Sequence, residues 1–205
     1  MNKKIVIFDL LGVITKESMF ATNIIYPMVK DKISYDLFKN KYLLYATGSI
    51  DKNDFWEFIC LKKDIEKFEK RIIKKTLLTP GIKKVMTDLA ASCCELYLAT
   101  EIPQRWGELL LEKGGIKKIF KKKFYSSDLL ATKPFSSFYK KVFSTINNGE
   151  IYYIDDTLIN LIAAQKIKSL NTVFYAPEDK FSFRKEINFN IDNLKKLNEV
   201  CKIKK

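Results

Sequence analysis

Short apolar runs of β-strand type recur along the chain, and segments with helical periodicity separate most of them. The β-type runs cover residues 4–8, 95–100, 122–127, 150–155 and 171–175. Apolar residues at helical spacing lie between them, over 80–92, 103–115, 134–149 and 157–171. Strands that alternate with helices favour parallel pairing through right-handed crossovers. The sequence therefore predicts an α/β fold built on a doubly wound parallel sheet.

Residues 16–78 interrupt this alternation. They contain no convincing strand, and their pattern predicts consecutive helices over roughly 17–30, 34–45, 51–61 and 65–77. Gly48 is placed to end the second of these helices, and Asp51 with Asp54 is placed to begin the third. We interpret the segment as a helical-bundle cap subdomain, inserted into a core domain of residues 1–15 and 79–205.

The residue types present exclude several kinds of chemistry. The chain contains no histidine, and its four cysteines show no CxxC spacing. Zinc sites built on His and Cys and His-based catalytic triads are therefore not expected. No apolar run approaches the ~20 residues of a membrane span, and Asp9 interrupts the apolar stretch near the N-terminus. We expect a cytoplasmic protein with no membrane partner.

The net charge of +13 raises the question of a nucleic-acid partner. The densest basic patch covers residues 117–123, but lysines are spread along the whole chain and no nucleic-acid motif is present. We interpret the charge as a solvated surface that attracts anionic metabolites. A nucleic-acid partner is not expected, and we expect a monomer or a weak dimer.

Polar residues stand at the carboxyl ends of the predicted strands, where open α/β sheets bind ligands. These residues are Asp9, Thr100, Asp155 and Asp156, and Lys133 opens the helix that precedes the last pair. Carboxylates in one crevice repel one another unless a cation lies between them, and oxygen ligands favour Mg²⁺. Thr100 and Lys133 suit a phosphoryl group. Gly12 allows a tight turn that brings backbone N–H groups toward an anion.

With these residues in place, the sequence resembles the haloacid dehalogenase superfamily, which consists mostly of Mg²⁺-dependent phosphohydrolases that work through an aspartyl-phosphate. The resemblance covers nearly the whole chain. Four segments carry it in the family's order and spacing, FDLLGVIT, LYLAT, TKP and YYIDDTLINLIAA. TGSIDKNDFWEFI is similar to the family's cap segment, and LTPGIKKVMTDLA to the return from the cap. The resemblance is closest to a capped branch that includes sugar-phosphate phosphatases, and it implies a Rossmann-like core.

The resemblance also implies a role for individual residues. Asp9 would be the nucleophile and a Mg²⁺ ligand, and the Leu11 carbonyl, Asp155 and Asp156 would complete the metal site. Thr100 and Lys133 would act on the phosphoryl group, and the substrate-binding residues would be Gly12, Thr100, Glu101 and Lys133. Asn160 falls where relatives often support the metal loop.

Leu11 departs from the family's pattern, because typical phosphatases carry an aspartate two residues beyond the nucleophile. That aspartate protonates the leaving oxygen and then deprotonates the attacking water, and such help is typically worth about 10²–10⁴-fold in rate. We therefore expect a slow or selective phosphohydrolase for a small phosphorylated metabolite, such as a sugar phosphate. One alternative is a catalytically silent phosphate- or nucleotide-binding regulatory protein. A dehalogenase is a third possibility, against which the Asp155–Asp156 pair argues.

Thr15 and Glu101 are the candidates to replace the missing proton carrier. Glu101 stands where relatives commonly have asparagine. A plainer interpretation is favoured, in which Glu101 points to solvent or forms an i,i+4 ion pair with Arg105 on a helix.

Overall fold

The computed structural model describes residues 3–59, 64–146 and 149–202. In this part of the chain, six parallel strands form one sheet in the order β3-β2-β1-β4-β5-β6. The strands are β1 (Lys4–Phe8), β2 (Cys94–Thr100), β3 (Phe120–Tyr125), β4 (Glu150–Asp155), β5 (Asn171–Tyr175) and β6 (Phe189–Ile191). The direction of strand order reverses between β1 and β4. The predicted doubly wound α/β sheet is confirmed.

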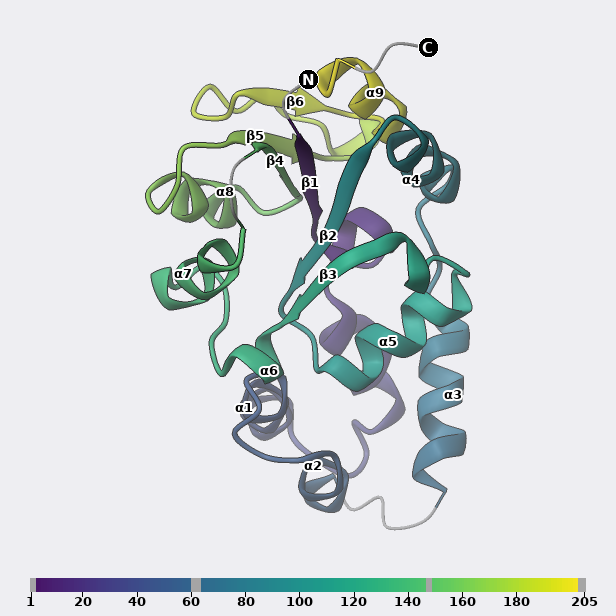
Figure 1. Cartoon of the computed structure of the whole chain (residues 1–205). Coiled ribbons are helices and arrows are strands. Elements are labelled where there is room, and N and C mark those ends of the chain that lie inside the picture. Colours follow the sequence, from purple (N-terminus) through teal and green to yellow (C-terminus); the bar gives the residue numbers. More distant parts are fainter. Residues whose placement is uncertain (1–2, 60–63, 147–148, 203–205) are drawn as a thin grey trace.

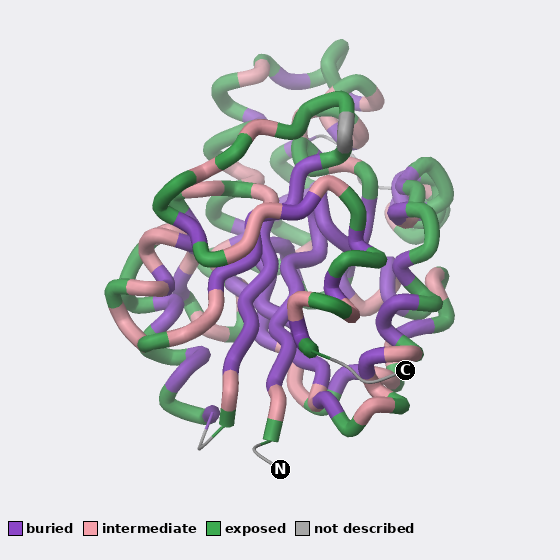
Figure 2. Tube along the Cα trace, turned by 90° about the horizontal axis from the view of Figure 1, so that it is seen from above, coloured by how far each residue is buried: buried purple, intermediate pink, exposed green. Residues whose placement is uncertain are grey.

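Helices cover both faces of the sheet (Figure 1). One face carries α4 (Ile82–Ala91), α5 (Gln104–Lys113) and α9 (Leu197–Val200), and the other carries α7 (Ser136–Ser144) and α8 (Leu158–Gln165). Val6 and Phe8 of β1 pack into the first layer, whereas Ile5 and Ile7 pack into the second. Because β1 is buried on both faces from Ile5 to Phe8, this part of its sequence is continuously apolar. Figure 2 shows the buried strands enclosed by helices with exposed outer surfaces.

The insertion between β1 and β2 is helical and lies beyond the carboxyl ends of the strands (Figure 1). It holds α1 (Tyr35–Ala46), α2 (Lys52–Phe58) and α3 (Ile65–Lys75). The outgoing and returning chains pair at one antiparallel bridge between Thr15 and Leu78. The amide of Lys16 donates to the carbonyl of Leu77 at 2.9 Å next to this bridge. The division into domains at residues 15 and 79 stays a prediction.

The predicted helices of the insertion differ in how regular they are. α1 and α3 follow the predicted ranges closely. The helix expected over 17–30 was wrong in length and regularity, because only a wide turn, Ala21–Ile25, and a tight turn, Tyr26–Met28, are helical. Pro27 lacks the amide hydrogen that a longer helix would need. α2 ends at Phe58, and the end predicted for it at 61 lies outside the described residues.

Outside the insertion, several elements differ from prediction. β3 begins at Phe120 rather than at 122 and is followed directly by the single turn of α6 (Ser126–Leu129). α8 ends at Gln165, well before the predicted 171. The sequence pattern missed β6, which has only three residues. None of the described helices is long and apolar enough to cross a membrane.

Aromatic side chains join the insertion to the core. The indole of Trp106 on α5 lies within 6.2 Å, centroid to centroid, of the rings of Phe20, Tyr42, Tyr45, Phe55 and Trp56. Glu69 of α3 is buried beside this cluster and accepts hydrogen bonds from Trp106 Nε1 at 2.9 Å and Trp56 Nε1 at 3.3 Å. The insertion therefore shares one continuous apolar cluster with the core.

Candidate functional site

Three carboxylates meet where β1 and β4 end. Phe8 lies opposite Ile154 in the ladder between these strands, so Asp9 follows beside Asp155 and Asp156. One oxygen from each of the three carboxylates lies within 4.8 Å of the others. Residues far apart in the sequence thus form a compact acidic cluster at the edge where parallel sheets bind ligands.

Lys133 provides the positive charge of this cluster. Its buried Nζ lies 3.0 Å from Asp9 Oδ1 and 2.7 Å from Asp155 Oδ2. Burial by itself lowers the pKa of Lys133, but Asp155 and Asp9 together raise it well above its ordinary value. The amide of Leu10 also donates to Asp9 Oδ1, at 2.7 Å. Within the described ranges Asp9 Oδ2 has no hydrogen-bond donor, so it is the oxygen left for a ligand.

Asp155 is held by protein donors on both oxygens. Oδ2 accepts from Lys133 and from the hydroxyl of Tyr153 at 3.2 Å. Oδ1 accepts from the amide of Thr157 at 2.9 Å and from Asn160 Nδ2 at 3.0 Å. Tyr153 was not predicted from the sequence, although its place two residues before Asp155 on a strand puts both on one face. We therefore expect Asp156 to supply a freer metal-binding oxygen than Asp155.

The electrostatics of the cluster favour a bound cation. Burial raises the pKa of Asp9 well above its ordinary value, with Lys133 opposing and Asp155 and Asp156 adding to the rise. Burial, followed by the charge of Asp155, raises the pKa of Asp156 to about 7. A set of carboxylate oxygens with surplus negative charge suits Mg²⁺, so the residues present fit this ion. The Leu11 carbonyl stays a predicted ligand.

Gly12 makes the close approach of Asp156 possible. It has a φ of 78° in the turn Leu10–Ile14, a conformation that favours glycine. A Cβ atom at this position would lie 2.0 Å from Asp156 Oδ2. The glycine in the first motif is therefore required by packing against a carboxylate of the site.

Thr100 ends β2, next to β1 in the sheet. Its hydroxyl is buried, and among the described residues it has no hydrogen-bond partner. A buried hydroxyl without a partner costs about 1–3 kcal/mol. A ligand oxygen would remove this cost, which agrees with the predicted contact to a phosphoryl group.

A cavity of about 440 Å³ lies between the insertion and the core. Residues from both parts line it, among them Phe20, Tyr42 and Leu43 of the insertion and Leu11, Glu101 and Lys133 of the core. Lys133 connects the cavity to the carboxylate cluster. A small ligand in this space can reach the charged groups.

The predicted ion pair between Glu101 and Arg105 was wrong. Arg105 Nε instead donates to Glu69 Oε2 at 2.7 Å. Glu101 lies just before α5 rather than inside a helix, so the i,i+4 geometry does not apply. Its carboxylate lines the cavity and accepts a hydrogen bond from Thr132 Oγ1 at 3.2 Å.

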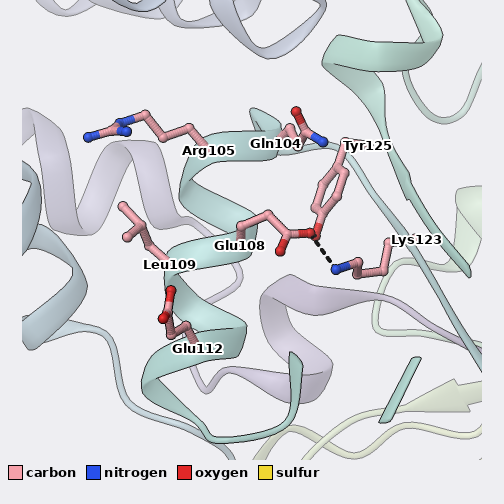
Figure 3. A pocket seen from close by; sticks show the side chains of 7 residues that line it. All are labelled: Gln104, Arg105, Glu108, Leu109, Glu112, Lys123 and Tyr125. Carbon is pink, nitrogen blue, oxygen red and sulfur yellow. Dashed lines mark hydrogen bonds and ion pairs between the residues drawn. The ribbon is translucent and has the colours of Figure 1, made fainter. Parts of the chain in front are cut away.

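A second hollow, of about 630 Å³, lies over α5 and β3, and Figure 3 shows its lining. Glu108 projects into it and is bound by Lys123 at 2.7 Å, Lys117 at 3.2 Å and the hydroxyl of Tyr125 at 2.7 Å. Two lysines of the 117–123 patch are thus paired with one carboxylate. This hollow contains none of the predicted site residues.

Comparison with known proteins identifies similar folds. Residues 6–172 match the family described as haloacid dehalogenase-like hydrolase. A HAD phosphatase from Thermococcus onnurineus is 20% identical, with a TM-score of 0.76 and coverage of 98% of this chain and 99% of that one. The magnesium-bound HAD-hydrolase YfnB from Bacillus subtilis is 18% identical, with a TM-score of 0.69 and coverage of 98% and 99%.

A 2-haloacid dehalogenase from Pseudomonas syringae pv. Tomato DC3000 is 14% identical, with a TM-score of 0.72 and coverage of 98% of both chains. No curated protein sequence matches the chain. At these identities the structural similarity shows the fold, and the chemistry has to be argued from the site.

Proposed function

We propose that this chain, which belongs to the haloacid dehalogenase-like hydrolases, is a Mg²⁺-dependent phosphohydrolase that acts on a small phosphorylated metabolite. The observation that carries the proposal is the meeting of Asp9, Asp155 and Asp156 with buried Lys133 beside a cavity. The similar structures include one named as a phosphatase and one bound to magnesium, which supports the same class of reaction.

Asp9 is the nucleophile in this proposal. Since the Leu10 amide and Lys133 hold Oδ1, Oδ2 attacks phosphorus and forms an aspartyl-phosphate as the bond to the leaving oxygen breaks. Lys133 offsets the negative charge of the phosphoryl group, and the unpartnered hydroxyl of Thr100 donates to one of its oxygens. Charges and donors fixed before the reaction are usually the largest catalytic contribution.

Mg²⁺ would be held by Asp156 and by the Asp9 oxygen that does not attack phosphorus, with Asp155 and the Leu11 carbonyl completing the site. When bound, the ion supplies positive charge that offsets the repulsion between the Asp9 carboxylate and the phosphoryl group. Its ligands all come from the ends of β1 and β4, so the sheet itself orients them.

The substrate is small, because the cavity holds about 440 Å³. Sugar phosphates are the first class to test. Leu11, Phe20 and Leu43 give part of the lining an apolar character, so phosphomonoesters with an apolar organic group are the second. Turnover is expected to be slow, since the side chain of Leu11 cannot carry a proton.

The test is hydrolysis of p-nitrophenyl phosphate and a panel of sugar phosphates, with Mg²⁺ and with chelator. We expect turnover that requires Mg²⁺ and is lost in Asp9→Asn, and a phosphorylated peptide containing Asp9 in acid-quenched digests. Asp88→Asn on the outer face of α4 is the matched control and should behave as the wild type, because among the described residues the Asp88 carboxylate pairs only with Lys84. Activity that survives in Asp9→Asn or in chelator overturns the proposal.

Because the side chain of Leu11 cannot transfer a proton, a second function is considered. The protein would bind a phosphorylated ligand without hydrolysing it. This alternative predicts Mg²⁺ and phosphate binding by calorimetry, no hydrolysis by the wild type, and hydrolysis gained in Leu11→Asp. A 2-haloacid substrate in the same panel tests the dehalogenase reaction.

A further inference from the structure

We propose that Glu101 is the general acid and base of the reaction, in the place where the side chain of Leu11 provides none. The inference rests on the proposed function and deepens it. Hydrolysis of a phosphomonoester needs a group that gives a proton to the leaving oxygen and later takes one from water. The geometry of the cavity assigns this task to one carboxyl group.

Other acidic groups near the cavity are committed elsewhere. Asp9 is the nucleophile, and both oxygens of Asp155 accept hydrogen bonds from protein donors. Asp156 is a predicted metal ligand that packs against Gly12. Lys133 is fixed between Asp9 and Asp155 and stays positively charged. Glu101 is the carboxyl that lines the substrate cavity itself.

The environment of Glu101 differs from that of an ordinary surface acid. It is half-buried, and in the described part of the chain no lysine or arginine lies within ion-pairing distance of it. Oε2 accepts one hydrogen bond from Thr132, and no protein donor among the described residues reaches Oε1. A partly desolvated carboxylate usually has a cation partner. Oε1 is therefore available to a group of the substrate.

Several titratable groups act on Glu101 from the elements around it. Partial burial raises the pKa of the Glu101 carboxyl, with Lys133 opposing and Asp155 adding to the rise. Its charge in turn acts on four groups around it, namely Lys133 before α7, Asp9 after β1, Tyr42 on α1 and Tyr139 on α7. Glu101 lines the cavity between the insertion and the core together with Lys133, which binds Asp9 and Asp155, so its carboxyl faces the space where the leaving group has to lie.

The proton balance is complete with Glu101 alone. In the first step Asp9 Oδ2 bonds to phosphorus, the bond from phosphorus to the leaving oxygen breaks, and the Glu101 carboxyl gives its proton to that oxygen. The alcohol leaves, and Glu101 is a carboxylate. In the second step this carboxylate takes a proton from water, whose oxygen bonds to phosphorus as the bond to Asp9 breaks. Phosphate leaves, and Asp9 and Glu101 return to their starting forms.

Glu108 on α5 provides a matched control. It is seven residues further along the chain and also half-buried, but its carboxylate is bound by Lys117 and, as Figure 3 shows, by Lys123 beside Tyr125. Glu101→Gln and Glu108→Gln therefore make the same chemical change in two environments. The Glu101 carboxyl has no lysine or arginine partner among the described residues, whereas the Glu108 carboxyl is paired with lysines. Only the first is expected to change the reaction.

The experiment compares two monoesters with aromatic groups of similar size, p-nitrophenyl phosphate and 2-phenylethyl phosphate. The alkoxide of the second needs a proton to leave, whereas nitrophenolate leaves without one. For Glu101→Gln we expect kcat/KM to fall about 100-fold or more for the phenylethyl ester and much less for the nitrophenyl ester, within the usual range of acid–base catalysis. Nitrophenol should appear in a burst as the aspartyl-phosphate accumulates.

Two further measurements exclude a merely structural effect. In the wild type, kcat/KM for 2-phenylethyl phosphate should fall as the pH rises through the raised pKa of Glu101 and the carboxyl loses its proton, and Glu101→Gln should lack this fall. Adding Leu11→Asp to Glu101→Gln should raise kcat/KM at least about tenfold above that of Glu101→Gln alone, since both side chains line the same cavity. Glu101→Asp, which keeps a carboxyl, should retain more activity than Glu101→Gln even if both variants are less stable.

The outcomes distinguish failure of the proposed function from failure of the role of Glu101. A wild type with no Mg²⁺-dependent turnover of either ester refutes the proposed function and, with it, this inference. An active wild type whose Glu101→Gln variant loses the same factor on both esters, or no more than Glu108→Gln, refutes the role of Glu101 and leaves the proposed function standing.

Discussion

Replacing Glu69 by alanine should destabilise the protein strongly, because this one carboxylate serves the insertion and the core together. It is 1% exposed and accepts hydrogen bonds from the indoles of Trp56 and Trp106. Without it, two buried N–H groups lose their acceptor at about 1–3 kcal/mol each, or about 2–6 kcal/mol in total. The ion pair with Arg105 adds little, since the arginine side chain is 39% exposed.

Urea unfolding followed by circular dichroism measures this loss. A loss of about 3 kcal/mol corresponds to a melting temperature lower by about 6–12 °C for a chain of this size. Glu69→Gln should cost much less, because an amide oxygen can still accept from both indoles. Trp106→Phe removes one of the two donors, so a double-mutant cycle with Glu69→Ala should show a coupling of about 1–3 kcal/mol. A coupling near zero would refute the reasoning.

Other predictions concern the site itself. Gly12→Ala should keep the fold but weaken Mg²⁺ binding in calorimetry by at least about tenfold, because the added Cβ would lie 2.0 Å from Asp156 Oδ2; unchanged affinity contradicts this. Thr100→Val should lower kcat/KM for aryl phosphates while leaving the melting temperature equal or higher, since the lost hydroxyl is unpartnered among the described residues. With the pKa of Asp156 raised to about 7, the folded, metal-free protein binds an extra proton, so its stability should fall as pH rises toward that value. Mg²⁺ displaces this proton, so its affinity should rise from about pH 6 to about pH 8 with proton release in calorimetry, and a falling affinity contradicts the assignment.

The sequence by itself determined the parallel sheet, the helical insertion and the polar residues at the strand ends. The apolar run of strand β1 is followed directly by Asp9, and such a pattern is set by local spacing and by burial on both faces. Parallel strands bring their carboxyl ends to one edge, so the meeting of Asp9 with Asp155 and Asp156 could be expected from order alone. Short or irregular elements such as β6 and the turns around Pro27 carry too little periodic signal for this kind of prediction.

Only the tertiary structure decided how the side chains are partnered. Local spacing predicted an ion pair between Arg105 and Glu101. In the structure α3 packs against α5, and Arg105 instead binds Glu69, which is 36 residues away in the chain. Two buried indoles need an acceptor, and no sequence pattern states which acidic residue will reach them. Glu101 lines the cavity, and the hydroxyl of Tyr153 donates to Asp155. The hydrogen-bond and ion-pair partners of these side chains depend on which helix faces pack together. Burial of the whole apolar cluster determines this packing, and no short stretch of residues determines it alone.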